Sequence, residues 1–312
     1  LPRPTGDGIG TIEYNSNLAH FYAHFVRHTI DTSLEGLTIV YDGANGAASS
    51  VGPEILSGLG AKVININVNP DGLNINDHCG STHIEGLQVA VQQHNADLGI
   101  ANDGDADRCL LVDEKGQVLD GDQIMLLCAL KLKEEGKLKD DTVVGTVMSN
   151  IGFHKAAEEL GMKTVSTAVG DRYVLEYMRE HDLSVGGEQS GHVIFLDHNT
   201  TGDGMLTAVQ VAALMKEKNQ PLSELAGIMT KYPQVLINVR VATKTGWEDN
   251  DIIKAAIVTA EGELGDEGRV LVRASGTEPL IRVMAEGPNQ EELQALCQEI
   301  ADIIGREQGL AE

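Results

Sequence analysis

The 312-residue sequence predicts an α/β protein: two similar three-layer units with mixed, mostly parallel sheets, followed by a smaller α+β domain. Strands and helices alternate over the first two thirds of the chain. A short pattern also recurs there, since Leu59-Gly-Ala-Lys and Leu160-Gly-Met-Lys both stand between a helix and a strand. The last third reads strand, helix, strand, strand, helix. We therefore place the domains at 1–115, 116–228 and 229–312.

The elements follow from runs of apolar residues and the turns between them. In the first unit we expect an amphipathic helix, a strand, a helix and a strand at 17–29, 37–41, 51–59 and 62–66. In the second we expect a helix, a strand, a helix, a strand and a closing helix at 122–135, 142–147, 151–160, 163–165 and 202–218. In the last domain we expect the five elements at 235–241, 249–263, 269–273, 280–286 and 290–306.

Two polar segments of the first unit stand apart from these elements. The glycine-rich turn 42–48 could present backbone N–H groups to a phosphate. It lacks the Lys-Ser/Thr of a P-loop, so we interpret it as a tight strand-to-helix turn. Residues 69–83 are polar, rich in turn-forming residues and without periodicity, which makes them a candidate functional loop.

Charge and composition narrow the class of protein. Lys and Arg number 23 against 47 Asp and Glu, a net charge of −24, which argues against nucleic acid or an anionic membrane as partner. No stretch approaches the ~20 apolar residues of a membrane span. The four cysteines are scattered without a CxxC, as expected of a cytoplasmic protein without a zinc site. The opening residues read like a linker and lack an initiator Met, so we expect the chain to begin inside a longer protein.

The segment 103–108 is the strongest candidate for chemistry. Asp103, Asp105 and Asp107 alternate with small residues in a loop between two apolar runs, and such a loop can turn three carboxylates toward one point. Hard oxygen ligands of this kind suit Mg²⁺, and Arg108 adds a cationic fork beside them for a phosphate. A solvated acidic turn is an alternative. An EF-hand calcium loop fits less well, because Arg108 stands where that loop needs Gly.

Two further loops follow along the chain. In Gly186–His192, the carboxylate of Glu188 could bind vicinal sugar hydroxyls and His192 could shuttle a proton. Arg172 begins a helix where a strand has just ended, and it could face the same cleft. In the last domain, Arg273-Ala-Ser-Gly-Thr-Glu-Pro279 and Arg282 combine two guanidinium groups with hydroxyls and could bind a phosphate dianion. An ordinary loop and a surface hairpin are the alternatives.

Taken in chain order, these loops resemble the motifs of the α-D-phosphohexomutase superfamily. Its metal loop DGDxDR, sugar loop GExSGH and phosphate loop RxSGTEPxxR correspond to 103–108, 187–192 and 273–282. Gln189 and the segment 74–83 are similar to the branch of the superfamily that acts on glucosamine phosphates. Ala106 departs from the pattern, because Gly is frequent there; the change is mild unless the position needs a positive φ.

The resemblance implies a fold of three similar α/β domains and a smaller domain of the TATA-binding-protein type, of which this chain covers the second to the fourth. No TASHNP-like stretch is present, so the family's phosphoserine and its N-terminal domain are missing. We therefore expect this chain not to turn over substrate alone. The N-terminal domain of the same protein would be its partner, and the full-length protein is a candidate homodimer.

The resemblance also implies the reaction and the roles of the residues. The whole enzyme would interconvert glucosamine 6-phosphate and glucosamine 1-phosphate through a phosphoserine and a bisphosphorylated sugar, in the synthesis of cell-wall precursors. Mg²⁺ would be bound by Asp103, Asp105 and Asp107; Arg108 would stabilise the transferring group; and His192 or Arg172 would carry the proton. The substrate would contact Glu188, Gln189, Ser190, Arg273, Ser275, Gly276, Thr277 and Arg282.

Two alternatives remain open at this point. A phosphomannomutase/phosphoglucomutase differs in its choice of sugar. A non-enzymatic phosphosugar-binding protein is an alternative of another class, which a serine-bearing domain encoded upstream would exclude. A metal-dependent phosphatase is less well supported, because no nucleophile is evident outside the metal loop.

Overall fold

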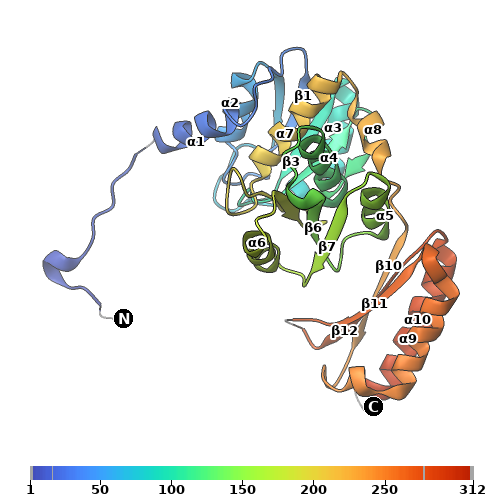
Figure 1. The fold of residues 1–312 in the computed structure, drawn as a ribbon. Helices are drawn as coiled ribbons and strands as arrows, with labels where there is room; N and C mark the ends of the chain where they lie inside the picture. Colours follow the sequence, from blue (N-terminus) through green and yellow to red (C-terminus); the bar gives the residue numbers. More distant parts are fainter. Residues whose placement is uncertain (1–2, 16, 277, 310–312) are drawn as a thin grey trace.

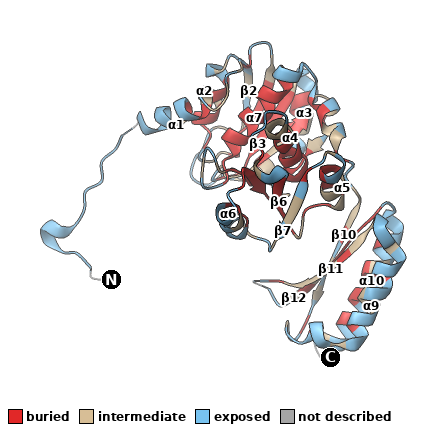
Figure 2. Ribbon diagram, in the orientation of Figure 1, coloured by how far each residue is buried: buried red, intermediate tan, exposed pale blue. Residues whose placement is uncertain are grey.

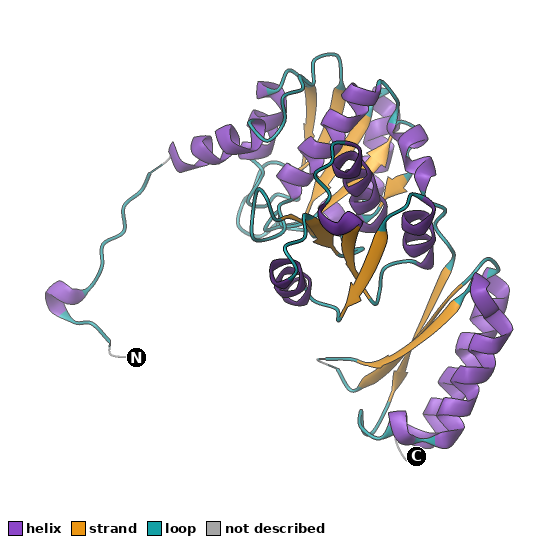
Figure 3. Cartoon of the chain, in the orientation of Figure 1, coloured by secondary structure: helices purple, strands orange, loops and turns teal. Residues whose placement is uncertain are grey.

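The structure, a computed structural model, describes residues 3–15, 17–276 and 278–309. It confirms the predicted class: two α/β units with mixed sheets and a smaller C-terminal domain (Figures 1 and 3). Residues 3–15 run away from the rest of the chain and carry a single 3-10 turn (Figure 1). No helix among the described residues is long and apolar enough to cross a membrane.

The first sheet has the order β2-β1-β3-β4-β5. Strand β1 is parallel to β2 and β3, β4 is antiparallel to β3, and β5 is antiparallel to β4. Its face alternation follows the two-residue period of a strand. On β1, Ile39 and Tyr41 face one side and Val40 the other, where α3 packs. The elements are α1 (Asn17–Arg27), β1 (Thr38–Asp42), α2 (Val51–Gly58), β2 (Lys62–Ile66), α3 (Glu85–His94), β3 (Leu98–Asn102), β4 (Cys109–Asp113) and β5 (Val118–Leu119).

The second sheet, β7-β6-β8-β9, repeats the order of β2-β1-β3-β4, with its last strand again antiparallel. The recurring pattern seen in the sequence has a structural counterpart, since Gly60 and Gly161 both end a helix with a positive φ, 95° and 68°. The elements are α4 (Gly121–Glu134), β6 (Thr142–Thr146), α5 (Ile151–Glu159), β7 (Lys163–Thr167), α6 (Asp171–Glu180), β8 (Val185–Gly187), β9 (Val193–Phe195), α7 (Gly204–Lys218) and α8 (Leu222–Leu225).

The two units share one core. Helices α1, α2, α4, α5 and α7 and one face of each sheet contribute to a single buried apolar cluster, and α7 is buried from Gly204 to Met215. Figure 2 shows this burial in red, concentrated where the two units meet. Helix α7 belongs to the second unit in sequence, but it packs on β3 and β4 of the first unit as well as on α4 of the second, and so it joins the two units.

The C-terminal domain is a three-stranded antiparallel sheet, β10-β12-β11, with α9 and α10 on one face. The helices lie on the side away from the α/β units (Figure 1), and their outer faces are exposed (Figure 2). The elements are β10 (Gln234–Arg240), α9 (Asp251–Leu264), β11 (Arg269–Ala274), β12 (Leu280–Glu286) and α10 (Gln290–Gln308). Each of the five predicted elements is found, with ends shifted by at most two residues.

Candidate functional site

The acidic loop lies between β3 and β4, as the apolar runs on either side predicted. Oxygens of Asp103, Asp105 and Asp107 all lie within 4.8 Å of one another. Burial, together with repulsion from Asp107 and Asp105, raises the pKa of Asp103 to about 6. Three converging carboxylate oxygens are the donor set that a hard divalent cation prefers, so the residues fit the ion that the sequence suggested.

The ends of this loop are tied together by Asn102 and Asp103. The Asn102 Nδ2 donates to the carbonyl oxygen of Arg108 at 2.7 Å, and Tyr41 Oη donates to Asn102 Oδ1 at 3.0 Å. The Arg108 N–H donates to Asp103 Oδ1 at 3.2 Å. Between them Ala106 adopts a φ of 62°, so this position does need a left-handed backbone. Alanine in place of glycine therefore strains the loop by about 1 kcal/mol.

The Arg108 guanidinium lies over the acidic loop. Its Nε is 3.7 Å from Asp103 Oδ2 and 3.8 Å from Asp107 Oδ1, and its side chain is 42% exposed. Beside the loop a cavity of about 430 Å³ is open to solvent. Its walls include Asp105, Asp107, Tyr22, Ala47, Gly202 and Asp203.

The glycine-rich turn 42–48, which we interpreted as a plain strand-to-helix connection, also supports the acidic loop. Ala47 N–H donates to the carbonyl oxygen of Gly104 at 2.8 Å. A Cβ on Gly46 would lie 2.2 Å from that same oxygen, so only glycine allows the two loops to pack. The sequence shows the glycines, but not that a segment 58 residues later packs against them.

Asp42, at the end of β1, was not among the predicted site residues. It is fully buried and accepts hydrogen bonds from Ala44 N, Gly80 N and Asn67 Nδ2 at 2.9, 3.0 and 2.9 Å. Burial raises its pKa. Through Gly80 it fixes the loop 69–83 beside the metal loop, where Asn76 N also donates to Ala44 O at 3.0 Å. The candidate loop thus packs against the turn that carries the acidic loop.

The sugar loop, 187–192, is joined directly to the acidic loop, 103–108. Arg108 and His192 form an antiparallel bridge, and Cys109 N–H donates to Gly191 O at 3.0 Å. His192 is 3% exposed; its Nδ1 lies 3.0 Å from Asp107 Oδ2, and its Nε2 accepts from Gly202 N at 3.0 Å. Two motifs 85 residues apart therefore form one unit.

The rest of the sugar loop rests on α4 and points outward. Gly121 N–H, in the first turn of α4, donates to the Gln189 carbonyl oxygen at 3.0 Å, while the Gln189 side chain is half-buried and Ser190 is exposed. Glu188 Oε1 accepts from Gly170 N at 3.0 Å, which ties the loop to the start of α6. Arg172 is the second residue of α6, with its side chain 79% exposed and paired with Glu176 at 2.7 Å.

The phosphate loop stands on the C-terminal sheet, apart from the other two. Arg273 on β11 and Arg282 on β12 are directly opposite each other, and burial and the neighbouring Arg282 lower the pKa of Arg273. Arg282 pairs with Glu278 at 3.3 Å, while its Nε is buried without a hydrogen-bond partner in the described structure. Ser275 is buried, Gly276 is exposed, and Thr277 lies outside the described residues.

Lys244 is a phosphate-loop contact that the sequence did not reveal. Its Nζ donates to the carbonyl oxygens of Ser275 and Gly276 at 2.7 and 3.2 Å. It therefore adds a third positive charge to the loop and holds its backbone in place. Lysine in a polar loop carries no sequence signal for such a contact, which arises from the fold alone.

Three family models match the chain in order. They describe the alpha/beta/alpha domain II, the alpha/beta/alpha domain III and the C-terminal domain of phosphoglucomutase/phosphomannomutase, over residues 13–116, 120–232 and 236–303. Among solved structures, a phosphoglucomutase/phosphomannomutase family protein of Burkholderia thailandensis superposes with a TM-score of 0.76 at 20% identity, over 93% of this chain and 64% of that one. An Aspergillus fumigatus N-acetylphosphoglucosamine mutase, solved with GlcNAc-6P and magnesium, gives 0.73 at 24%, over 90% and 68%. At these identities the structures confirm the fold alone.

The sequence relatives are much closer. The phosphoglucosamine mutase of Geobacillus thermodenitrificans is 52% identical over 99% of this chain, and that of Desulforamulus reducens is 54% identical over 98%. That of Bacillus subtilis is 51% identical over 99%. In each case the chain spans 69% of the relative's length. The chain therefore belongs to the phosphoglucosamine mutase family of the phosphohexomutase superfamily.

Proposed function

We propose that this chain supplies the metal, sugar and phosphate sites with which a phosphoglucosamine mutase interconverts glucosamine 6-phosphate and glucosamine 1-phosphate. The observation that carries the proposal is that the acidic loop and the sugar loop are joined directly. His192 is hydrogen-bonded to Asp107 and forms an antiparallel bridge with Arg108. It puts a metal-binding group and a sugar-binding group within one rigid unit. Phosphoryl transfer between a sugar and a metal-bound group needs this kind of fixed placement.

Asp103, Asp105 and Asp107 would hold the metal, for which we propose Mg²⁺. When bound, the ion supplies Lewis-acid stabilisation to a phosphoryl oxygen. Arg108 would bind the same phosphoryl group from the side through its exposed guanidinium, and its ion pairs with Asp103 and Asp107 keep it over the loop.

Glu188, Gln189 and Ser190 would bind the sugar. Glu188 Oε1 already accepts one hydrogen bond, from Gly170, which fixes the carboxylate and leaves acceptor capacity for hydroxyl groups. We propose that Gln189 contacts the substituent at position 2, because its side chain leaves the loop whose backbone is held by α4. The 51–54% identity to relatives named phosphoglucosamine mutase supports the choice of an amino sugar.

His192 was our first candidate for a proton shuttle, but its surroundings favour another role. Because Gly202 donates to Nε2, the neutral ring carries its proton on Nδ1 and donates it to Asp107. Both nitrogens are thus engaged in a 3%-exposed ring, and we propose that His192 positions Asp107. Arg172 stays positively charged at any working pH and suits charge stabilisation better than proton transfer.

Arg273, Ser275, Gly276 and Arg282 would bind the phosphate that is not reacting, with Thr277 included on the strength of the motif. The two guanidinium groups face each other across β11 and β12, an arrangement that disfavours the empty site and favours a dianion. Since the sequence has no phosphoserine motif, the phosphoryl donor of this mechanism would come from outside these 312 residues, and we expect no turnover by this chain alone.

The test is calorimetric titration of the chain with glucosamine 6-phosphate and with mannose 6-phosphate in the presence of Mg²⁺, alongside the variant Arg282→Ala. We expect preference for the amino sugar and weaker binding by the variant. Preference for mannose 6-phosphate would assign the chain to phosphomannomutase/phosphoglucomutase activity. Turnover without any added protein would show that the phosphoryl donor lies within this chain.

A further inference from the structure

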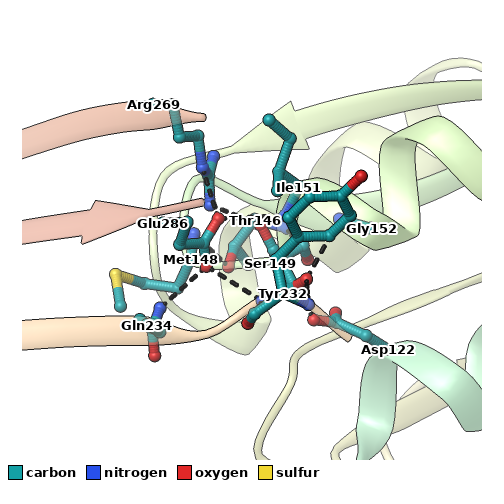
Figure 4. A network of polar contacts seen from close by, with 11 residues as sticks. Asp122, Thr146, Met148, Ser149, Ile151, Gly152, Tyr232, Gln234, Arg269 and Glu286 are labelled. Atoms are coloured by element: carbon teal, nitrogen blue, oxygen red, sulfur yellow. Dashed lines mark hydrogen bonds and ion pairs between the residues drawn. The ribbon is translucent and has the colours of Figure 1, made fainter. Parts of the chain in front are cut away.

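Glu286, the last residue of β12, is a carboxylate with no exposed surface and four hydrogen-bond donors around it (Figure 4). Two donors belong to its own sheet: Arg269 Nε at 2.7 Å and Gln234 Nε2 at 2.9 Å. The other two belong to the start of α5 in the preceding unit: Ile151 N at 2.9 Å and Asn150 Nδ2 at 3.3 Å. One side chain therefore joins the C-terminal domain to the second α/β unit.

We call this contact region between the C-terminal sheet and the start of α5 the joint. On the α5 side it is built around Asn150, the N-cap of that helix. Its Oδ1 accepts from Gly152 N and from Tyr232 N, both at 3.0 Å, and its Nδ2 donates to Tyr232 O at 3.0 Å. The connection into β10 is therefore paired with the helix cap in both directions. Arg269 also reaches across the boundary and donates to the carbonyl oxygen of Ser149.

The packing at this boundary leaves no free space at Gly152. A Cβ on that residue would lie 1.9 Å from the carbonyl oxygen of Thr230. The first turn of α5 and the segment that leads to β10 are thus in direct backbone contact. Any rotation of the C-terminal domain about this point must break either that contact or the hydrogen bonds of Glu286.

The joint is connected to the phosphate loop by two strands. Arg269 pairs with Glu286 at one end of β11 and β12, and Arg273 pairs with Arg282 at the other. The two pairs are four positions apart on each strand, so they lie on the same face of the sheet, about 13 Å apart. The opposite face is fixed against α9 and α10 by the buried residues Val270, Val283 and Ala285.

A carboxylate suits this position better than an amide would. It can accept from all four donors, and it lies at the positive end of α5. A glutamine would place its NH₂ group either at Oε2, where Arg269 and the Ile151 N–H donate, or at Oε1, where Gln234 and Asn150 donate. Both positions face donors, so at least one contact would become repulsive.

We propose that Glu286 is a positioning residue: by fixing the C-terminal sheet to the start of α5, it sets where Arg273 and Arg282 stand relative to the sugar loop. The positional part of this proposal rests on the phosphate site proposed above. The joint itself does not, because its contacts involve neither a ligand nor the phosphate loop.

The test compares Glu286→Gln with Glu299→Gln, which removes one charge from an exposed position on α10 of the same domain. Small-angle scattering of the chain should show a broader distance distribution for Glu286→Gln and no change for Glu299→Gln. Affinity for glucosamine 6-phosphate, which needs contacts on both sides of the joint, should fall at least tenfold. Affinity for inorganic phosphate, which needs only the C-terminal domain, should stay within twofold.

Gly152→Ala provides a second way to disturb the joint, because it leaves Glu286 intact and pushes Thr230 away from α5. We expect the same broader distance distribution in scattering. Affinity should again fall for glucosamine 6-phosphate and stay within twofold for inorganic phosphate. Unchanged scattering in both variants would overturn the proposal, whatever the ligands do. If the parent chain binds neither ligand, the proposed phosphate site fails, while the scattering still decides whether Glu286 fixes the domain. Equal losses for both ligands would mean that Glu286 only stabilises the fold.

Discussion

Asp107 accepts a hydrogen bond from Nδ1 of the buried His192 ring at 3.0 Å, and this contact joins the acidic loop to the sugar loop. The ring is oriented from its other side by Gly202, whose N–H donates to Nε2. Carboxylates held in this way keep one rotamer, so the metal-binding oxygens lose little freedom when an ion binds. The sugar loop thereby contributes to the proposed metal site without supplying a ligand.

Replacing His192 tests this relationship. In His192→Ala, Asp107 loses its donor, and we expect Mg²⁺ affinity to fall about 10- to 100-fold. Calorimetric titration with MgCl₂ measures the change. His94→Ala, on the exposed end of α3, is the control and should leave the affinity unchanged. Unaltered Mg²⁺ binding in His192→Ala would mean that Asp107 is positioned by other contacts.

Gly46→Ala tests the support of the acidic loop by the turn 42–48. The added Cβ would meet the Gly104 oxygen at 2.2 Å, so the loop must shift. We expect a loss of about 1–3 kcal/mol in the free energy of unfolding, together with weaker Mg²⁺ binding. Gly86→Ala is the matched control: nothing lies within 4 Å of its Cβ position, and alanine in helix α3 should stabilise slightly. Denaturant titration of the two variants decides the matter.

The acidic loop and the turn 42–48 show which features could be predicted from the sequence. The convergence of the acidic loop was predictable because its carboxylates are local: three of them alternate with small residues within five positions between two apolar runs. Most helices and strands were predictable for the same reason, since periodicity is a local property. The short strands β5, β8 and β9 and the helices α3 and α8 were not among the expected elements. The role of Gly46 was not, because it depends on a contact with Gly104 that only the packed sheet creates.

Buried polar residues escaped prediction in the same way. Glu286 ends an ordinary strand, and its partner Ile151 lies 135 residues earlier. Asp42 reads as the first residue of a turn, although three donors surround it in the structure. In both cases the residue type is common at its position in the sequence. Only burial shows that the charge must be compensated.

Protons and metal should compete for Asp103. Its pKa is raised to about 6, so between the ordinary pKa of an aspartate near 4 and about 6 the folded chain holds a proton that the unfolded chain has released. The metal needs the ionised form, and its affinity should therefore drop as the pH falls below about 6. Thermal melts with and without Mg²⁺ should show stabilisation by the ion at pH 7.5 that is lost at pH 5 and after chelation. Equal stabilisation at both pH values would contradict this competition.

Asp122 lies next to the joint, where it accepts a hydrogen bond from Asn150. Its burial lowers the stability of the folded chain by an amount that depends on pH. Burial, with repulsion from Asp120, raises its pKa to about 7, although Asn150 N donates to its Oδ2 at 2.8 Å. As the pH rises from about 4 to 7, the folded state must give up a proton that the unfolded state has already lost, so stability declines through this window and the full cost remains above it.

Asp122→Asn removes the charge and keeps an oxygen for the Asn150 N–H. We expect the variant to gain about 2 kcal/mol more over the parent chain at pH 8 than at pH 5. Denaturant titrations of both proteins at the two pH values give this difference. Asp197→Asn, at an exposed position, controls for the loss of one negative charge. The same gain at both pH values would mean that Asp122 is not the group that titrates.

Arg282 should show opposite effects on stability and on binding. It faces Arg273 across two strands, and like charges in this position repel by about 0.2–1 kcal/mol. Arg282→Ala removes that repulsion, so without ligand we expect a melting temperature equal to or above that of the parent chain. With saturating phosphate the parent chain should melt higher and the variant should not, because one of the two guanidinium forks is gone. Arg306→Ala, on the exposed end of α10, should behave like the parent chain in both conditions. If Arg282→Ala destabilised the ligand-free chain and left the phosphate effect intact, Arg282 would be a structural residue, and the facing arginines would not form the phosphate site.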